Sequence, residues 1–130
     1  STEPTVDGPA SLPTTYAGGG SFYLSGPTLD CPPPEGGPSC HITVTAKSQK
    51  RLRLKAHGTR KVRTIGKVSY DIASNRDMAD IHPAVLTSDG ARALKRFGKV
   101  KVVAHVTNVL DATHHAARDF TVTVKPGHHP

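Results

Sequence analysis

A strict alternation of apolar and polar residues recurs along this chain and constrains its fold more than any other feature. It is clearest in residues 42–46, 68–72, 100–106 and 120–124, where apolar side chains occupy every second position. Successive side chains of a β-strand point to opposite faces, so a period of two predicts strands with one buried face and one exposed face. Such faces are stable only when they are packed together. The sequence therefore predicts two packed sheets.

Shorter apolar stretches lie between these four strands. We expect an earlier strand at residues 21–24 or 28–31, another at 51–55 with Leu52 and Leu54 facing inward, and a short one near 81–86. Roughly seven short strands separated by turn signals are typical of an immunoglobulin-like Greek-key β-sandwich. The expected fold class is therefore all-β.

One segment departs from the period of two. Residues 88–97, "SDGARALKRF", place Leu94 and Phe97 on one stripe and are followed by Gly98. Ser88 is a suitable N-cap, and a glycine directly after the last turn is a common helix end. We expect a short crossover helix at about residues 88–97, held in place because Leu94 and Phe97 pack on the sheets.

Charge divides the chain into two parts. The first 46 residues contain four acidic residues and no Lys or Arg, whereas the remainder contains all seventeen Lys and Arg residues and six acidic ones. The two parts carry −4 and +11, which give the net charge of +7. A part this basic attracts polyanions, although charge alone does not identify the polyanion.

The first segment is rich in Pro, Gly, Thr and Ser. Residues 1–20 have few side chains to bury, and this composition favours a flexible linker. We expect a disordered linker at 1–20, one Ig-like domain at 21–126 and a flexible tail at 127–130. No apolar run approaches the roughly 20 residues that cross a bilayer, so we expect no transmembrane segment.

The two cysteines flank a short loop. Cys31 and Cys40 enclose eight residues, of which four are Pro and two are Gly. A zinc site would need further ligands at suitable spacing, and a redox pair usually has the form Cys-x-x-Cys at a helix start. We therefore favour a disulfide between Cys31 and Cys40. Structural disulfides are typical of proteins outside the cytosol, so we expect an extracellular or cell-wall-associated location.

Several motifs occur in an order that resembles a known family. "LDCPPPEGGPSCHITVTA", "IGKVSYDIA", "LTSDGARALKRFGKVKVVAHVTNVLDA" and "FTVTVK" are similar to the Ig-like repeat domains of secreted and surface proteins from high-GC Gram-positive bacteria. The match covers about residues 28–125. It departs where Asp111 and Ala112 lead to Thr113 in place of a Gly-Asn pair. The resemblance implies a β-sandwich, an extracytoplasmic location and a non-catalytic role as spacer, stalk or adhesion module. We separately expect neighbouring domains of a larger chain as partners.

The most basic stretch is residues 47–63, "KSQKRLRLKAHGTRKVR", which has eight basic residues and no acidic one. If residues 51–55 form a strand, alternate cations project in a row along one face, which suits a repeating polyanion. The candidate polyanion-binding residues are Lys47, Lys50, Arg51, Arg53, Lys55, Arg60, Lys61 and Arg63. Further cations could extend the row if the fold brings them near: Arg92, Lys95, Arg96, Lys99 and Lys101. The interpretation that we favour is simpler: a solvated face that protects an edge strand from pairing.

The basic stretch does not have the features of a nucleic-acid reader. It contains no aromatic residue for base stacking, and the sequence carries no RNP, helix-turn-helix or zinc-finger pattern. We therefore expect no sequence-specific nucleic acid as a partner. A phosphate- or carboxylate-bearing polymer or glycan of the cell envelope is the more consistent polyanion.

Catalytic and metal chemistry are not indicated. The adjacent pairs His114–His115 and His128–His129 would point to opposite sides of an extended chain, and no nucleophile elbow, His-Glu-x-x-His motif or phosphate loop occurs. We expect no catalytic residues, no metal and no cofactor, so the chain is not expected to be an enzyme. The expected function is a non-catalytic extracellular Ig-like module that serves as a spacer or adhesion domain. The alternatives are a polyanion- or carbohydrate-binding module that targets a larger protein to the envelope, or a protein-binding edge at residues 100–109.

Overall fold

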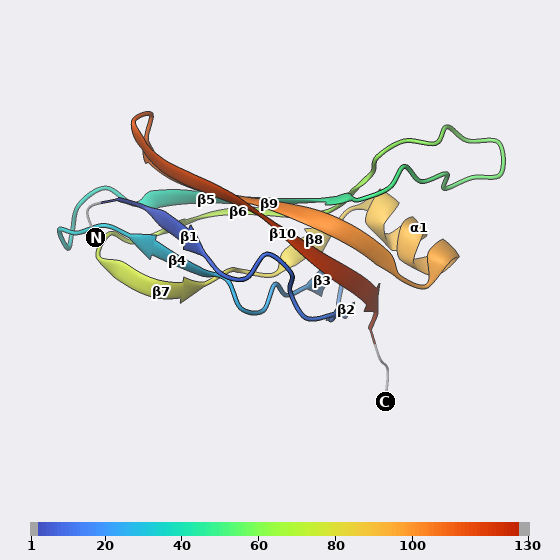
Figure 1. The fold of residues 1–130 in the computed structure, drawn as a ribbon, viewed down its shortest axis with the longest axis horizontal. Coiled ribbons are helices and arrows are strands. Elements are labelled where there is room, and N and C mark those ends of the chain that lie inside the picture. Colours follow the sequence, from blue (N-terminus) through green and yellow to red (C-terminus); the bar gives the residue numbers. More distant parts are fainter. Residues whose placement is uncertain (1–2, 128–130) are drawn as a thin grey trace.

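The computed structural model describes residues 3–127, which form two packed β-sheets and one short helix (Figure 1). The all-β, sandwich-like fold that the alternation predicts is confirmed. The larger sheet contains β2 (Thr15–Ala17), β3 (Ser21–Phe22), β5 (Cys40–Ser48), β6 (Thr64–Ile72), β8 (Ala84–Leu86), β9 (Val100–Asp111) and β10 (His114–Pro126). The smaller sheet contains β1 (Thr5–Asp7), β4 (Thr28–Cys31) and β7 (Arg76–Asp80).

The four alternating segments form the centre of the larger sheet. The strand order is β2-β10-β9-β5-β6-β8-β3 in that sheet and β1-β4-β7 in the smaller one. Neighbours from β10 to β6 are antiparallel, whereas β2 runs parallel to β10. Because β9 lies between β10 and β5, it is an interior strand. The hypothesis that residues 100–109 offer a free protein-binding edge is therefore wrong.

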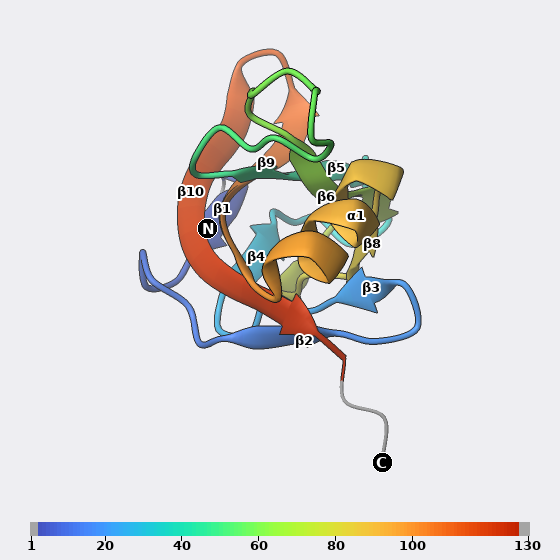
Figure 2. The ribbon, with the colours of Figure 1, turned by 90° about the vertical axis from the view of Figure 1, so that its right-hand side faces the viewer.

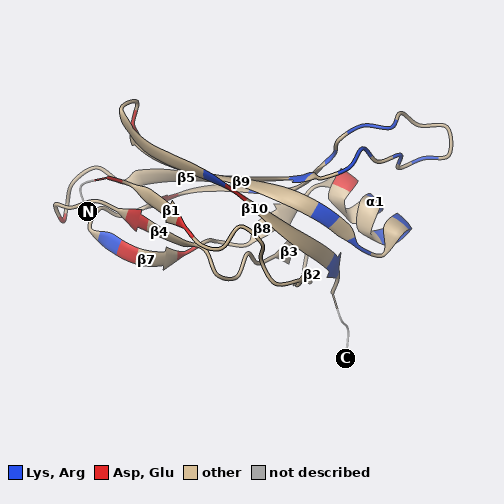
Figure 3. Cartoon of the chain, in the orientation of Figure 1, with Lys and Arg blue, Asp and Glu red and all other residues tan. Residues whose placement is uncertain are grey.

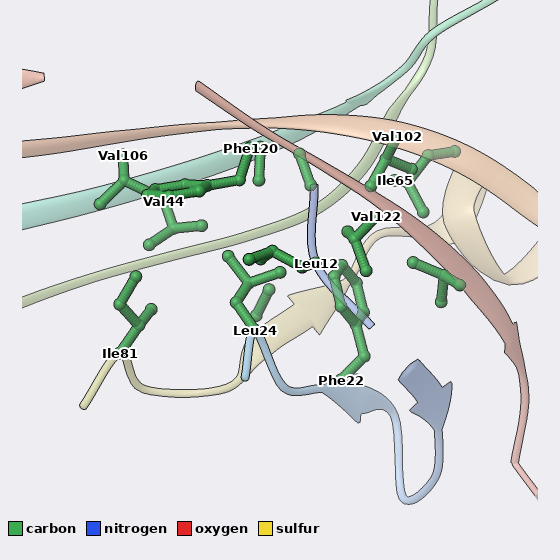
Figure 4. Packing of buried hydrophobic residues seen from close by; sticks show 14 of the residues in the cluster. Leu12, Phe22, Leu24, Val44, Ile65, Ile81, Val102, Val106, Phe120 and Val122 are labelled. Atoms are coloured by element: carbon green, nitrogen blue, oxygen red, sulfur yellow. The ribbon is translucent and has the colours of Figure 1, made fainter. Parts of the chain in front are cut away.

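The core lies between the two sheets. Alternate residues of β5, β9 and β10, such as Val44, Val102 and Phe120, point inward and are fully buried. Figure 4 shows these side chains facing Leu24 and Ile81, which come from the opposite side of the core. Burial of each such side chain contributes about 1.5–3 kcal/mol relative to exposure, so the two faces stabilise each other.

The structure corrects the expectation that residues 1–20 form a disordered linker. Residues 5–7 pair with β4, and residues 15–17 pair with β10. Val6 and Leu12 are buried in the common core. This segment belongs to the domain because its few apolar residues fill the core and its backbone completes both sheets. Of the expected tail, only Gly127 lies within the described residues.

The expected strand at residues 51–55 is also wrong. Residues 49–63 form a long loop between β5 and β6, in which one isolated backbone bridge joins Leu52 to Lys61. Leu52 and Leu54 are only partly buried, although they do pack against the core. By contrast, both alternatives for the early strand occur, as β3 and β4, and the strand near residues 81–86 occurs as β8.

The helix α1 (Ser88–Phe97) has the predicted bounds and covers one end of the larger sheet. Its N-cap is Thr87, not Ser88: the Thr87 hydroxyl accepts a hydrogen bond from the Gly90 amide. Gly98 ends the helix in the left-handed region with φ of 73°. Leu94 is 5% exposed, as expected, but Phe97 is 43% exposed and does not pack in the core. Figure 2 shows α1 within the curve of the larger sheet, beneath the loop 49–63.

The Cys31–Cys40 disulfide is present, which confirms the predicted pairing. It joins the last residue of β4 to the first residue of β5 and thereby links the smaller sheet to the larger one. Both cysteines are buried, so the bond is part of the core.

Candidate functional site

The loop 49–63 projects beyond the sheets at the end of the molecule where α1 lies (Figure 1). Its two arms exchange backbone hydrogen bonds: the Leu52 amide donates to the Lys61 carbonyl at 2.8 Å, and the Lys61 amide donates to the Leu52 carbonyl at 3.2 Å. The arms are thus held side by side. The loop carries seven of the eight predicted polyanion-binding residues, namely Lys50, Arg51, Arg53, Lys55, Arg60, Lys61 and Arg63.

Arg63 organises this loop. Its Nε donates to the Leu52 carbonyl at 3.3 Å, and its Nη2 donates to the Thr59 carbonyl at 2.6 Å. Its Nη1 lies 3.6 Å from Asp89 Oδ2 on α1, and the Arg63 side chain is only 11% exposed. A guanidinium with a rigid fork of donors suits such bridging. Arg63 therefore joins both arms to the helix, and its main role in this structure is to position the loop.

Three grooves lie around the loop and α1. The Phe97 groove has a volume of about 500 Å³ and is lined by Ser48, Gln49, Lys50, Leu52, Phe97, Lys99, Val100, Lys101 and Thr123. The arginine groove, of about 340 Å³, is lined by Lys50, Arg51, Leu52, Arg53, Arg60, Arg96 and Phe97. These two grooves share Lys50, Leu52 and Phe97, so they are continuous.

The third groove, which we call the Asp89 groove, lies between the loop and the first part of α1. It has a volume of about 220 Å³ and is lined by Leu54, Lys55, Gly58, Thr59, Lys61, Arg63, Asp89 and Arg92. Asp89 is the one acidic residue among the described groove-lining residues, and it already lies next to Arg63. The charged side chains that line the grooves are therefore mainly cations.

The structure separates the predicted site residues into three groups. Six of them line grooves and have no positioning role comparable to that of Arg63: Lys50, Arg51, Arg53, Lys55, Arg60 and Lys61. Arg63 lines a groove but positions the loop. Lys47 lies on β5 outside the grooves, on the exposed face of the larger sheet.

Some of the later cations are brought to the same place. Arg92 and Arg96 of α1 and Lys99 and Lys101 near β9 line the grooves, whereas Lys95 does not. Figure 3 shows Lys and Arg along both arms of the loop and near α1, and most Asp and Glu residues toward the other end of the molecule. The described domain is therefore electrostatically asymmetric along its length.

Sequence reasoning missed the groove role of Phe97. The spacing of three residues from Leu94 suggested a second core residue, but Phe97 is the last residue of the helix and is exposed, whereas Leu94 is buried. The guanidinium of Arg96 lies 5.7 Å from the centre of the Phe97 ring, which is within the range of a cation–π contact. The basic residues on both sides of Phe97 in the sequence, Arg96 and Lys99, were the signal that could have indicated its place in a basic groove.

A second polar cluster lies on the exposed face of the larger sheet. His41 Nδ1 is 2.7 Å from Asp71 Oδ1, and His41 Nε2 is 2.9 Å from Ser69 Oγ. This is the order of groups in a Ser-His-Asp triad. However, the backbone amides of β5 and β6 lie in the plane of the sheet, directed toward the strands on either side, so they offer no oxyanion donors above the serine. We do not assign catalysis to this cluster.

The turn between β9 and β10 contains a third cluster. Asp111 Oδ1 accepts hydrogen bonds from the Thr113 and His114 amides, each at 2.9 Å, and lies 2.8 Å from His114 Nδ1. The bond with the His114 side chain, followed by the Thr113 amide, lowers the pKa of Asp111 to about 2. The same bond with Asp111 raises the pKa of His114. The cluster closes the turn and contains no cavity-lining residue.

The described residues, 3–127, contain neither a cluster of metal ligands nor a membrane-spanning helix. Within this range no group of three or more His, Cys, Asp or Glu side chains is arranged to hold a metal ion. No helix in the same range has the length and apolar character needed to cross a membrane. His128 and His129 lie outside the described residues.

Comparison with models of protein families, with curated proteins and with solved structures gives no match for this chain. The resemblance to bacterial Ig-like repeat domains therefore stays a prediction from the sequence motifs.

Proposed function

We propose that this chain is a non-catalytic, extracellular Ig-like domain that binds an anionic polymer of the cell envelope at its loop–helix end. The observation that carries the proposal is the arrangement of the three grooves. Cations from the loop, the helix and β9, which are far apart in the sequence, line grooves at the same end of the domain. The one acidic side chain that lines these grooves, Asp89, already lies next to Arg63. Such an arrangement would concentrate a polyanion at one end of the domain.

Many weak contacts would supply the affinity. An exposed ion pair contributes about 0–1 kcal/mol, so a single small anion would be held poorly. A polymer can contact cations of several grooves at the same time, so the ion-pair contributions add. The translational and rotational entropy of association is lost only once for the whole polymer. The proposal thus specifies a repeating ligand. Since the charges are exposed, binding should weaken strongly as salt increases.

The extracellular location rests on the disulfide. A buried Cys31–Cys40 bond is stable in an oxidising compartment and uncommon in the cytosol. The envelope is therefore the source of polyanion that we propose.

A role as a spacer is the second candidate. Figure 1 shows β1 toward one end of the elongated domain and the end of β10 toward the other, an arrangement that would let the domain separate two neighbours in a longer chain. A spacer does not require the groove cations, so charge removal there discriminates between the two functions.

The test compares two variants that lose equal charge. One carries Arg51→Gln, Arg53→Gln and Arg60→Gln in the arginine groove. The control carries Lys67→Gln, Arg76→Gln and Lys125→Gln, which lie outside the grooves. Binding to teichoic acid, an acidic glycan and polyphosphate is measured by calorimetry and amide NMR at low and moderate salt. We expect a loss of about tenfold or more for the groove variant and little change for the control.

Three results would contradict the proposal. Equal losses in both variants would mean that binding depends on net charge alone. Salt-independent binding would contradict the electrostatic mechanism. The absence of binding to every polymer would leave the spacer function.

A further inference from the structure

The Phe97 groove differs from its neighbours because its floor is apolar. Leu52, Phe97 and Val100 line it, and Phe97 is 43% exposed at the surface. An exposed aromatic ring beside other apolar side chains in a hollow is a common feature of sites for ligands with an apolar face. Charge alone does not account for this part of the surface.

Cations surround this apolar floor. Lys50, Lys99 and Lys101 line the same groove, and Arg96 lies beside the Phe97 ring. A ligand that fills the groove must therefore present an apolar face to the floor and negative charge to the lysines. The groove also continues past Leu52 and Phe97 into the arginine groove, so the ligand can continue as a chain with further charges.

We propose that the Phe97 groove binds one sugar residue of an acidic polysaccharide. The C–H face of the sugar ring covers Phe97 and Leu52, and the carboxylate or sulfate group of the same or the next residue contacts the lysines. The following residues of the polymer lie along the arginine groove. This inference rests on the proposed function, because it names the class of polyanion that the loop–helix end selects.

The shape of the site favours a polysaccharide over other polyanions. Inorganic polyphosphate has no apolar face for Phe97. A bilayer is flat, and the loop tip at residues 55–58, Lys-Ala-His-Gly, presents no large apolar side chain to insert. Single-stranded nucleic acid is usually held by bases stacked on several aromatic residues, whereas Phe97 is the one aromatic residue lining the described grooves.

The experiment compares ligands that share charge but differ in their apolar faces. An oligogalacturonate and a linear polyphosphate of equal charge are titrated into the intact chain and into Phe97→Ala. Tyr23→Ala is the matched control, because Tyr23 is an aromatic residue that is 57% exposed and does not line a groove. Methyl and aromatic NMR signals of Leu52, Phe97 and Val100 report where each ligand lies.

We expect Phe97→Ala to weaken oligogalacturonate binding about five- to twentyfold, comparable to the loss of one stacking contact, and to change polyphosphate binding less than twofold. Tyr23→Ala should leave both affinities unchanged. Oligogalacturonate, but not polyphosphate, should shift the signals of Leu52, Phe97 and Val100.

Failure of this inference can be told apart from failure of the proposed function. If both ligands bind but Phe97→Ala affects neither or affects both equally, the polysaccharide inference is wrong and polyanion binding stands. Tighter, Phe97-dependent binding of an acidic peptide or of anionic phospholipid vesicles would also overturn the inference. If no polyanion binds, the proposed function itself fails.

Discussion

Gly90 fixes the distance between α1 and the larger sheet, and its replacement by Ala should destabilise the domain. A Cβ at this position would overlap the carbonyl oxygen of Ile65 on β6 and would lie 2.9 Å from the carbonyl carbon. These are backbone atoms of a paired strand, so they cannot move out of the way by a change of rotamer, as a flexible side chain could. The helix must therefore move away from β6.

The cost of this movement can be estimated from the contacts that it weakens. Overpacking costs about 1–3 kcal/mol, and the higher helix propensity of Ala returns about 1 kcal/mol. The retreat also weakens the Thr87 cap, which contributes about 1 kcal/mol. It withdraws Leu94 from the core, for which partial exposure costs about 1–2 kcal/mol. The expected net loss is about 2–5 kcal/mol, or roughly 7–18 °C in Tm for a domain of this size.

Urea unfolding of Gly90→Ala, followed by circular dichroism, measures this loss. Gly18→Ala is the matched control, because a Cβ at Gly18 meets no atom within 4 Å. It should change the free energy of unfolding by less than about 1 kcal/mol. Because α1 forms one wall of the grooves, Gly90→Ala should also weaken polyanion binding under conditions where it stays folded. A Gly90→Ala variant as stable as the original chain would refute the close packing of α1 on β6.

Two further predictions concern the disulfide and the β9–β10 turn. Replacing Cys31 and Cys40 by Ser should lower the free energy of unfolding by about 2.7 kcal/mol in the chain-entropy treatment of a ten-residue loop. Denaturation of the original chain in reductant should give a similar loss. Equal stability of the oxidised original chain and the Ser variant would contradict this prediction. In the turn, the lowered pKa of Asp111 means that its contribution is complete above its ordinary value of 3.8 and is lost as pH falls through about 2. The raised pKa of His114 means that its contribution is complete below its ordinary value of 6.5 and is lost as pH rises through the raised pKa. The turn should therefore be most stable at pH values between these two ordinary pKa values. NMR titration of the Asp111 and His114 side chains, with Asp111→Asn as the comparison, tests this pH range. An ordinary pKa for His114 in the intact chain would contradict the prediction.

The sequence predicts those parts of the fold that depend on local pattern. The alternation in residues 42–46 and 100–106 and the capped stripe at 88–97 each contain their own signal, because strand and helix periods are read over a few residues. The disulfide follows from two cysteines and a turn-rich loop between them. The strand order could not be predicted in this way, because it depends on contacts between distant segments. The Ig-like Greek-key topology stays a prediction.

Other elements depend on partners that the local sequence does not reveal. The strands at residues 5–7 and 15–17 are short and lie among Pro and Gly, and they form because β4 and β10 offer free edges. β7 has no apolar alternation and forms as an edge strand beside β4. The segment 51–55 has the alternation of a strand, yet its arm pairs with the other arm through one bridge only, so pattern alone misleads there.

The sequence predicted only part of the candidate site, because the rest of the site also depends on distant segments of the chain. The basic loop is contiguous in the sequence, but its grooves need α1 and the start of β9, which lie some thirty to fifty residues further along the chain. The apolar floor was not predicted, because Phe97 fits the pattern of a core residue.

The pairing of residues 15–17 with β10 protects the chain from aggregation through an open strand edge. The amide of Leu12 donates to the Thr121 carbonyl and the amide of Thr121 donates to the Ala10 carbonyl, each at 2.8 Å. The early segment therefore occupies the outer edge of β10 from Thr121 to Pro126. Without it, this long strand would present an open row of backbone donors and acceptors, which is a template for aggregation. The early segment therefore acts as a built-in cover against self-association. Because it reaches β10 across about one hundred residues of chain, we expect it to dock late in folding, so nascent chains are most prone to misassembly just before it docks.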